Sequence, residues 1–200
     1  MFRMVALVSL AAPSILAGTV AVQVRDASSS IEDAVVYAIP EGRVPPPTRQ
    51  TAIMDQKDRM FIPHVLAIQT GTAVQFPNSD DIRHHVYSFS PAKHFQLPLY
   101  KGNPASPVVF DKAGVVTLGC NIHDRMTAFI VIVDTPWFTI TDGSGRGELT
   151  ELPDGTYALH VWYPDMKRSS LPIDITIDGD EHLSVPLVVG REAKDGDGSP

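Results

Sequence analysis

Turn-forming residues interrupt this chain at short intervals. Its 200 residues include 17 prolines and 14 glycines, which suits short strands joined by turns and leaves little room for long helices. Between the breaks, apolar residues often alternate with polar ones, as in Ile173, Ile175 and Ile177. That period is typical of a half-buried strand. Because 44% of the residues are hydrophobic, the sequence predicts an all-β chain with a packed core.

The two ends of the chain differ from the rest. Residues 1–17 combine one positive charge with a short apolar run, which is the layout of a secretory signal. The run is too short, and too interrupted by Pro13, to span a membrane. A buried N-terminal strand is the alternative. We therefore predict a periplasmic or otherwise exported protein whose mature chain is not inserted in the membrane. The polar, Gly- and Asp-rich residues 191–200 are predicted to be a disordered tail.

Charge and cysteine content exclude several classes of function. The net charge is −7 and no cluster of lysines or arginines occurs, which argues against nucleic acid or an anionic membrane surface as a partner. A single cysteine excludes an intramolecular disulfide, a four-cysteine zinc site, an iron–sulfur cluster held by several cysteines and a dinuclear copper centre with two thiolates.

That one cysteine stands in a sequence that favours a metal site. Cys120 is followed by His123 and Met126 at intervals of three residues. A thiolate, an imidazole and a thioether suit a copper ion, but a second histidine is needed from another segment. His84 or His85 can supply it. Zinc also accepts one cysteine and two histidines, although it gains little from methionine. A cysteine hydrolase would hold its base across a cleft rather than in the same turn, so we predict no enzyme activity.

The order His, Cys-x-x-His-x-x-Met resembles the cupredoxins, or blue copper proteins, and the loop length is similar to the amicyanin type. Phe76-x-Asn78 ahead of the histidines is also similar to the plastocyanin and amicyanin pattern. This resemblance covers residues 51–135. It implies a Greek-key sandwich that binds one copper ion. The ligands implied are His84, Cys120, His123 and Met126, with His85 as the substitute for His84. If His84 is the ligand, His85 stands where the family usually has asparagine and is the candidate for tying the two copper loops together.

The same resemblance implies a one-electron carrier, with His123 as the exit for the electron. The likeness of the chain to proteins labelled methylamine utilisation proteins implies a c-type cytochrome or a periplasmic dehydrogenase as its partner. Two other functions remain open, which are copper delivery or storage and a metal-free scaffold or adhesion module. We expect the loop carboxylates of Asp80, Asp81 and Asp124 to be solvated, where they could help to select a basic partner.

The segments on either side resemble a different family. The series T-D-x-x-G followed by L-P-D-G-x-Y-x-L, within residues 141–159, is similar to the carboxypeptidase regulatory-like domain, a small transthyretin-like β-sandwich. The hairpin that begins such domains has its match in residues 22–36. The resemblance implies a second sandwich built from residues 18–45 and 136–190, with a copper domain of residues 46–135 inserted. Within the latter, we expect residues 91–107 to be irregular with a short helical turn.

Overall fold

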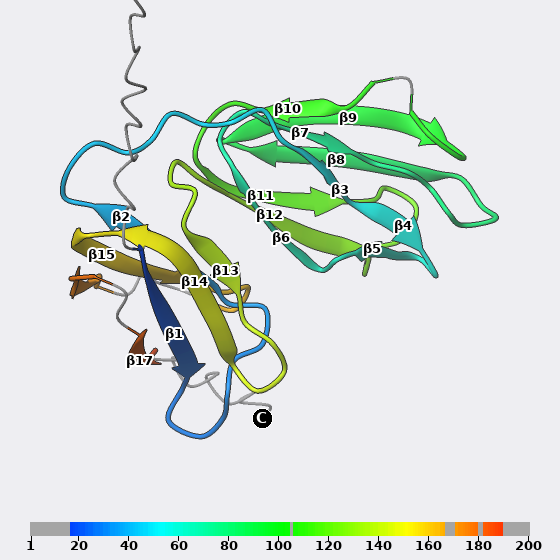
Figure 1. Cartoon of the computed structure of the whole chain (residues 1–200). Helices are drawn as coiled ribbons and strands as arrows, with labels where there is room; N and C mark the ends of the chain where they lie inside the picture. Colours follow the sequence, from blue (N-terminus) through cyan, green and yellow to red (C-terminus); the bar gives the residue numbers. More distant parts are fainter. Residues whose placement is uncertain (1–16, 105, 167–170, 180–181, 190–200) are drawn as a thin grey trace, which may run out of the picture.

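The computed structural model describes residues 17–104, 106–166, 171–179 and 182–189 (Figure 1). Within these residues the chain consists of strands and turns without a helix, which confirms the all-β prediction. It follows that no described segment forms a helix that could cross a membrane. The predicted tail lies outside the described residues, as does the predicted signal apart from Ala17, which begins the first strand.

In the described part of the chain, seventeen strands form five sheets. In chain order they are β1 (Ala17–Arg25), β2 (Val35–Pro40), β3 (Thr51–Ile53), β4 (Asp55–Lys57), β5 (Met60–Ile62), β6 (Val65–Gln69), β7 (Thr72–Gln75), β8 (His84–Ser90), β9 (Lys93–Tyr100), β10 (Val108–Phe110), β11 (Gly114–Gly119), β12 (Thr127–Val133), β13 (Phe138–Ile140), β14 (Arg146–Pro153), β15 (Gly155–Trp162), β16 (Ile173–Ile177) and β17 (His182–Val188).

Strands β3 to β12 build what we call the first sandwich. Its larger sheet has the order β6-β12-β11-β8-β9 and faces a smaller sheet, β10-β7-β3, while β4 and β5 form a hairpin. The core between the sheets takes every second side chain of each strand, as the alternation of a pleated strand requires. In β11, for example, Val116 and Leu118 are fully buried and Thr117 between them is exposed.

The second sandwich is built from β1, β2 and β13 to β17. Its sheets have the orders β14-β1-β17 and β13-β2-β15-β16, and they enclose an apolar core to which Val20, Val22 and Val24 of β1 contribute alternate side chains. Two of these strands precede the first sandwich in the sequence and five follow it. The domain limits expected from the sequence, at residues 45 and 136, stay a prediction.

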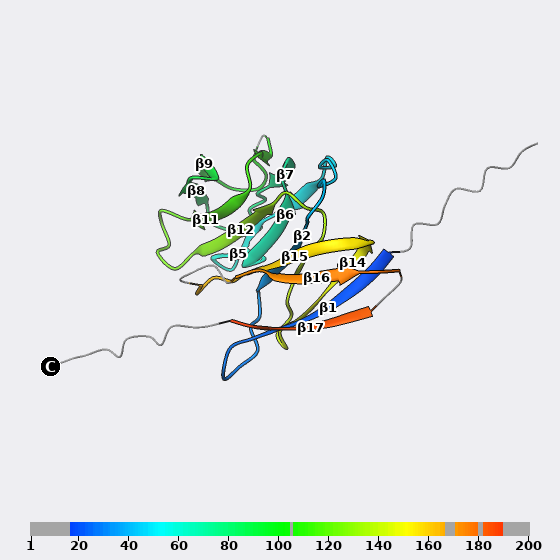
Figure 2. The same cartoon turned by 90° about the vertical axis from the view of Figure 1, so that its left-hand side faces the viewer.

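A small apolar cluster joins the two sandwiches, which lie against each other in both views (Figures 1 and 2). Val35 of β2 packs with Val131 and Val133 of β12. Beside them the rings of Phe129 and Trp162 lie 5.3 Å apart between centroids. The outer face of β12 is therefore covered by the second sandwich, whereas its inner face belongs to the core of the first.

One local prediction is wrong. Residues 91–107 were expected to be irregular, but β9 occupies 93–100 and pairs along β8. Phe95, Leu97 and Tyr100 pack against the core of the first sandwich, and this burial decides the conformation. Pro98 is tolerated because β9 is the edge strand of its sheet, where a missing N–H leaves no partner unsatisfied.

Candidate metal centre

Strand β11 ends just before Cys120 and places this residue at one end of the core of the first sandwich. Val116 and Leu118 face the core, and Cys120 continues the same alternation just beyond the strand, with 5% of its surface exposed. A tight turn follows, in which the Met126 N–H donates to the His123 carbonyl oxygen at 3.0 Å. The turn folds the loop back between β11 and β12, so His123 lies close to the cysteine.

Strand β8 separates the two neighbouring histidines. Successive side chains of a strand point to opposite faces, and here His84 is fully buried on the core side together with Val86. His85 lies on the other face, where its Nε2 is 2.7 Å from Nε2 of Gln96 on β9. Burial holds the pKa of His85 below its usual value. His85 thus pairs with the neighbouring strand β9 through Gln96 and is not a member of the donor cluster described below.

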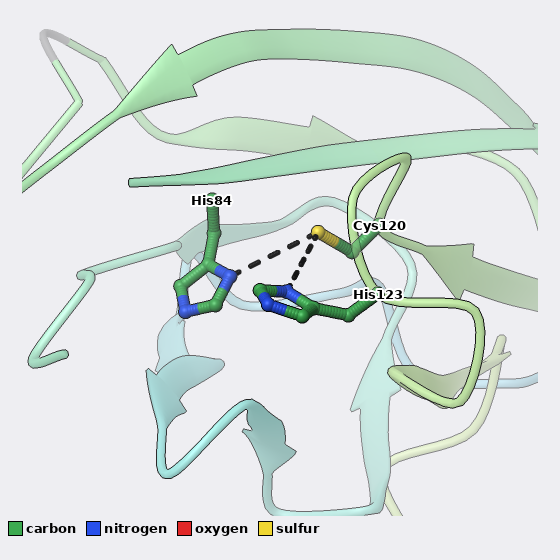
Figure 3. A group of neighbouring side chains, drawn as sticks. All are labelled: His84, Cys120 and His123. Atoms are coloured by element: carbon green, nitrogen blue, oxygen red, sulfur yellow. Dashed lines mark hydrogen bonds between the residues drawn. The ribbon is translucent and has the colours of Figure 1, made fainter. Parts of the chain in front are cut away.

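Three donor atoms from these two segments converge (Figure 3). The Cys120 Sγ lies 3.8 Å from Nδ1 of His84 and 3.9 Å from Nδ1 of His123. The two imidazole rings are 5.1 Å apart between centroids. Among the described residues this is the one group of three or more His, Cys, Asp or Glu side chains with ligand atoms close enough to share a metal ion, all within 4.8 Å of one another.

These separations fit a metal ion between the donors. Metal–sulfur and metal–nitrogen bonds in zinc sites are about 2.3 Å and about 2.0 Å long, so two such donors 120° apart around one ion stand roughly 3.7 Å from each other. The observed values of 3.8 and 3.9 Å are close to that figure, although they also allow weak hydrogen bonds to sulfur. One thiolate with two imidazoles is a donor set for copper or zinc.

Met126 lies in the same buried part of the molecule. It is 2% exposed and belongs to the core cluster that contains Cys120. Together with Cys120 and Tyr87 it lines a cavity of about 260 Å³ beside the cysteine loop. The ring of Tyr87 covers Gly119 so closely that a Cβ there would come within 2.7 Å of it, so a larger residue before the cysteine would displace this ring.

Asp80 is not the solvated carboxylate that the sequence suggested. Its side chain is only 11% exposed, and one oxygen lies 2.5 Å from Nε2 of His84. Burial raises the pKa of Asp80, but hydrogen bonds from the Arg59 N–H, His84 and the Asp58 N–H lower it more, so the net shift is downward. The sequence offered one signal, the four-residue spacing from the histidine. Asp81 and Asp124 are exposed, as expected.

The Phe76-x-Asn78 pattern has a structural basis beside the site. Asn78 donates through its side-chain amide to the carbonyl oxygens of Ile82, at 2.9 Å, and Tyr100, at 2.8 Å. The Tyr100 hydroxyl donates in turn to the Phe76 carbonyl oxygen at 2.6 Å, and burial raises the pKa of Tyr100 to about 12. These bonds fix the turn that precedes His84, and with it the start of β8.

Comparison with known proteins gives the following. No family model matches the chain, and no curated protein matches its sequence. Among similar solved structures is a purple cupredoxin from Nitrosopumilus maritimus, 21% identical with a TM-score of 0.36, for which the match covers 42% of this chain and 99% of the other. An oxidized amicyanin variant is 17% identical with a TM-score of 0.38, covering 48% and 99%.

A third match is a copper-containing nitrite reductase from Thermus scotoductus, 24% identical with a TM-score of 0.38. It covers 48% of this chain but only 25% of the reductase. Similarities at this level carry no argument about ligands or activity, which must come from the convergent donor atoms themselves.

Proposed function

We propose that this chain binds one copper ion in a type 1 site and carries single electrons. The observation that carries the proposal is the convergence of Cys120 Sγ with one nitrogen each of His84 and His123 at 3.8 and 3.9 Å. Met126, buried in the same cluster, is the proposed fourth and weaker ligand. Copper bound there would supply one-electron chemistry by cycling between Cu(I) and Cu(II).

The three convergent residues differ in exposure, and this difference suggests separate roles. His84 and Cys120 are buried, whereas His123 is partly exposed. Its neighbour Ile122 is 48% exposed. An electron leaving through His123 therefore has the shortest route to a docked partner, and the apolar Ile122 beside it suits a weak, transient interface. Strands β8 and β11 hold the buried donors, which limits how far they move when the charge of the site changes.

The remaining sequence predictions enter as part of the proposal. We infer an exported protein, with a cleaved signal at residues 1–17 and a c-type cytochrome or periplasmic dehydrogenase as redox partner. The copper domain comprises residues 46–135. It is inserted in a carboxypeptidase regulatory-like sandwich of residues 18–45 and 136–190. The proposed redox partner is supported only by the sequence resemblance to methylamine utilisation proteins.

The experiment is to add Cu(II) to the metal-free protein, without an affinity tag, and to record visible and electron paramagnetic resonance spectra. An intense thiolate-to-copper band with narrow hyperfine splitting is expected, and Cys120→Ser should abolish it. His84→Gln and His85→Gln form a matched pair on opposite faces of β8. Only the first should remove the blue band. A colourless protein, or copper uptake that is unchanged in Cys120→Ser, would contradict the proposal.

Two further measurements separate the alternative functions. A copper-delivery or storage protein exchanges its ion through an open site and gives poorly reversible voltammetry, whereas an electron carrier gives a reversible couple. The burial of Cys120 to 5% exposure favours the carrier. A metal-free scaffold would be purified with copper near zero and would take none up.

A further inference from the structure

The buried histidine has a charged partner on the side away from the cysteine. Nδ1 of His84 faces Cys120, and the second ring nitrogen points in the opposite direction (Figure 3). That second nitrogen, Nε2, lies 2.5 Å from an Asp80 carboxylate oxygen. His84 is fully buried and the Asp80 side chain is 11% exposed. A carboxylate accepts hydrogen bonds only, so Nε2 must carry the proton and donate it to this bond.

The Asp80 carboxylate is itself fixed by the backbone of a hairpin. Asp58 and Arg59 form the turn between β4 and β5, and both have positive φ, 53° and 58°. Their N–H groups donate to the two Asp80 oxygens at 2.7 and 3.0 Å. The Asp80 N–H donates to the Asn78 side-chain oxygen at 3.0 Å. The carboxylate is therefore held in place by groups that do not depend on His84.

We propose that Asp80 is a positioning residue that keeps the proton of His84 on Nε2 and so presents the Nδ1 lone pair to the metal. This inference rests on the proposed function. A carboxylate behind a ligand histidine fixes the ring and raises its donor strength, and losing such a partner typically costs 10- to 100-fold in metal affinity. The fixed negative charge also favours the more positive ion, so Asp80 stabilises Cu(II) relative to Cu(I).

The test compares Asp80→Asn and Asp80→Ala with Asp81→Asn in the full-length protein. Asp81 is the matched control because its removal changes the net charge equally, while its side chain is exposed and lies outside the donor cluster. Affinities for Cu(II) and Cu(I) are measured by competition with chelators, and the reduction potential by voltammetry. We expect Asp80→Asn to lose about tenfold more affinity for Cu(II) than for Cu(I), a rise of about 59 mV in potential. Asp80→Ala should lose more, and Asp81→Asn should match the wild type.

A second readout needs no copper. Nitrogen-15 spectra of the metal-free protein at pH 8 report which ring nitrogen of His84 carries the proton, and we expect Nε2 in the wild type and a mixture in Asp80→Ala. A proton on Nδ1 in the wild type would overturn the inference, as would Asp80 variants whose affinity ratio and potential equal those of Asp81→Asn. If the wild type forms a blue site but the Asp80 variants behave as the control, this inference alone fails. If the wild type forms no blue copper site, both the proposed function and this inference fail.

Discussion

The two sandwiches share an architecture but differ in what they bury. The core of the second sandwich consists of aliphatic residues and the rings of Tyr157 and Tyr163. The core of the first is also apolar over most of its length, but at one end it includes Cys120 and Met126, and His84 is fully buried beside them. Burying an imidazole is unfavourable unless its nitrogens are paired, and here the cost is offset by Asp80 on one side of the ring.

Turns show the same contrast. In the second sandwich the carboxylate of Asp26 accepts hydrogen bonds from the backbone of Ser28 and Ser29, within its own turn. In the first sandwich Asp80 joins one turn to a histidine of β8 and to the hairpin that ends β4. Asp80 thus connects three segments of the first sandwich, and one of them carries a histidine of the candidate site.

Removing the cysteine is the strongest test that the first sandwich, and not the second, binds the metal. A ligand present at 1,000 times its dissociation constant adds about 4 kcal/mol to the free energy of unfolding. We expect Cys120→Ala to lose that copper-dependent stabilisation while the metal-free protein remains folded. Thermal unfolding with and without Cu(II) measures it. Val20→Ala, in the core of the second sandwich, is the control and should lower the transitions of both forms equally. A copper-dependent shift that survives in Cys120→Ala would place the metal elsewhere.

The variant Leu159→Ala tests whether the second sandwich contributes to the candidate metal centre. Leu159 is 1% exposed, and truncation of a buried leucine typically lowers the free energy of unfolding by about 2–5 kcal/mol. We expect this loss in chemical denaturation with an unchanged copper spectrum. Leu118→Ala is the counterpart in the first sandwich, two residues before Cys120, and should lose similar stability together with copper affinity. A copper spectrum altered by Leu159→Ala would show that the two cores are not independent.

Trp162→Ala sharpens the comparison at the junction. Trp162 is partly buried against the cluster that joins the sandwiches, and its ring contacts Phe129 of β12. Removing a half-buried aromatic side chain should cost about 2 kcal/mol. The expected result in calorimetry is a broadened or divided unfolding transition, because the two cores would then unfold separately. Tyr87→Ala removes an aromatic ring of β8 that is not part of this cluster, and it should leave the transition undivided. A single sharp transition in Trp162→Ala would contradict this role for the junction.

Much of the fold follows from patterns that lie within one strand. The alternation of Val20, Val22 and Val24 predicts β1, and the run before Cys120 predicts β11, because the core selects every second side chain. Strand β9 was missed because His94 and Pro98 obscure its alternation. Its conformation depends on pairing with β8 and on packing against the core, neither of which a local pattern records.

The candidate site likewise has a part that the sequence predicts and a part that depends on tertiary structure. The spacing of Cys120, His123 and Met126 within one loop is visible in the sequence, and the resemblance to cupredoxins adds His84. The Asp80 contact was not predicted, since a loop carboxylate four residues before a histidine is usually solvated. What buries it is the β4–β5 hairpin, whose turn lies about twenty residues earlier, and the docking of that turn is a tertiary effect.

The smallest predicted effect concerns that turn. Arg59 adopts a φ of 58° in the first sandwich, and Glu151 adopts the same φ in the second. A residue with a side chain is disfavoured there by about 1–2 kcal/mol, while glycine brings an entropic cost of about 0.5–1 kcal/mol. Arg59→Gly and Glu151→Gly should each raise the free energy of unfolding by up to about 1 kcal/mol, and Arg59→Ala should not. The N–H that Arg59 donates to Asp80 is kept in Arg59→Gly, so the copper spectrum should not change. A loss of stability in Arg59→Gly alone would mean that the arginine side chain, and not only its backbone, holds the hairpin on the candidate metal centre.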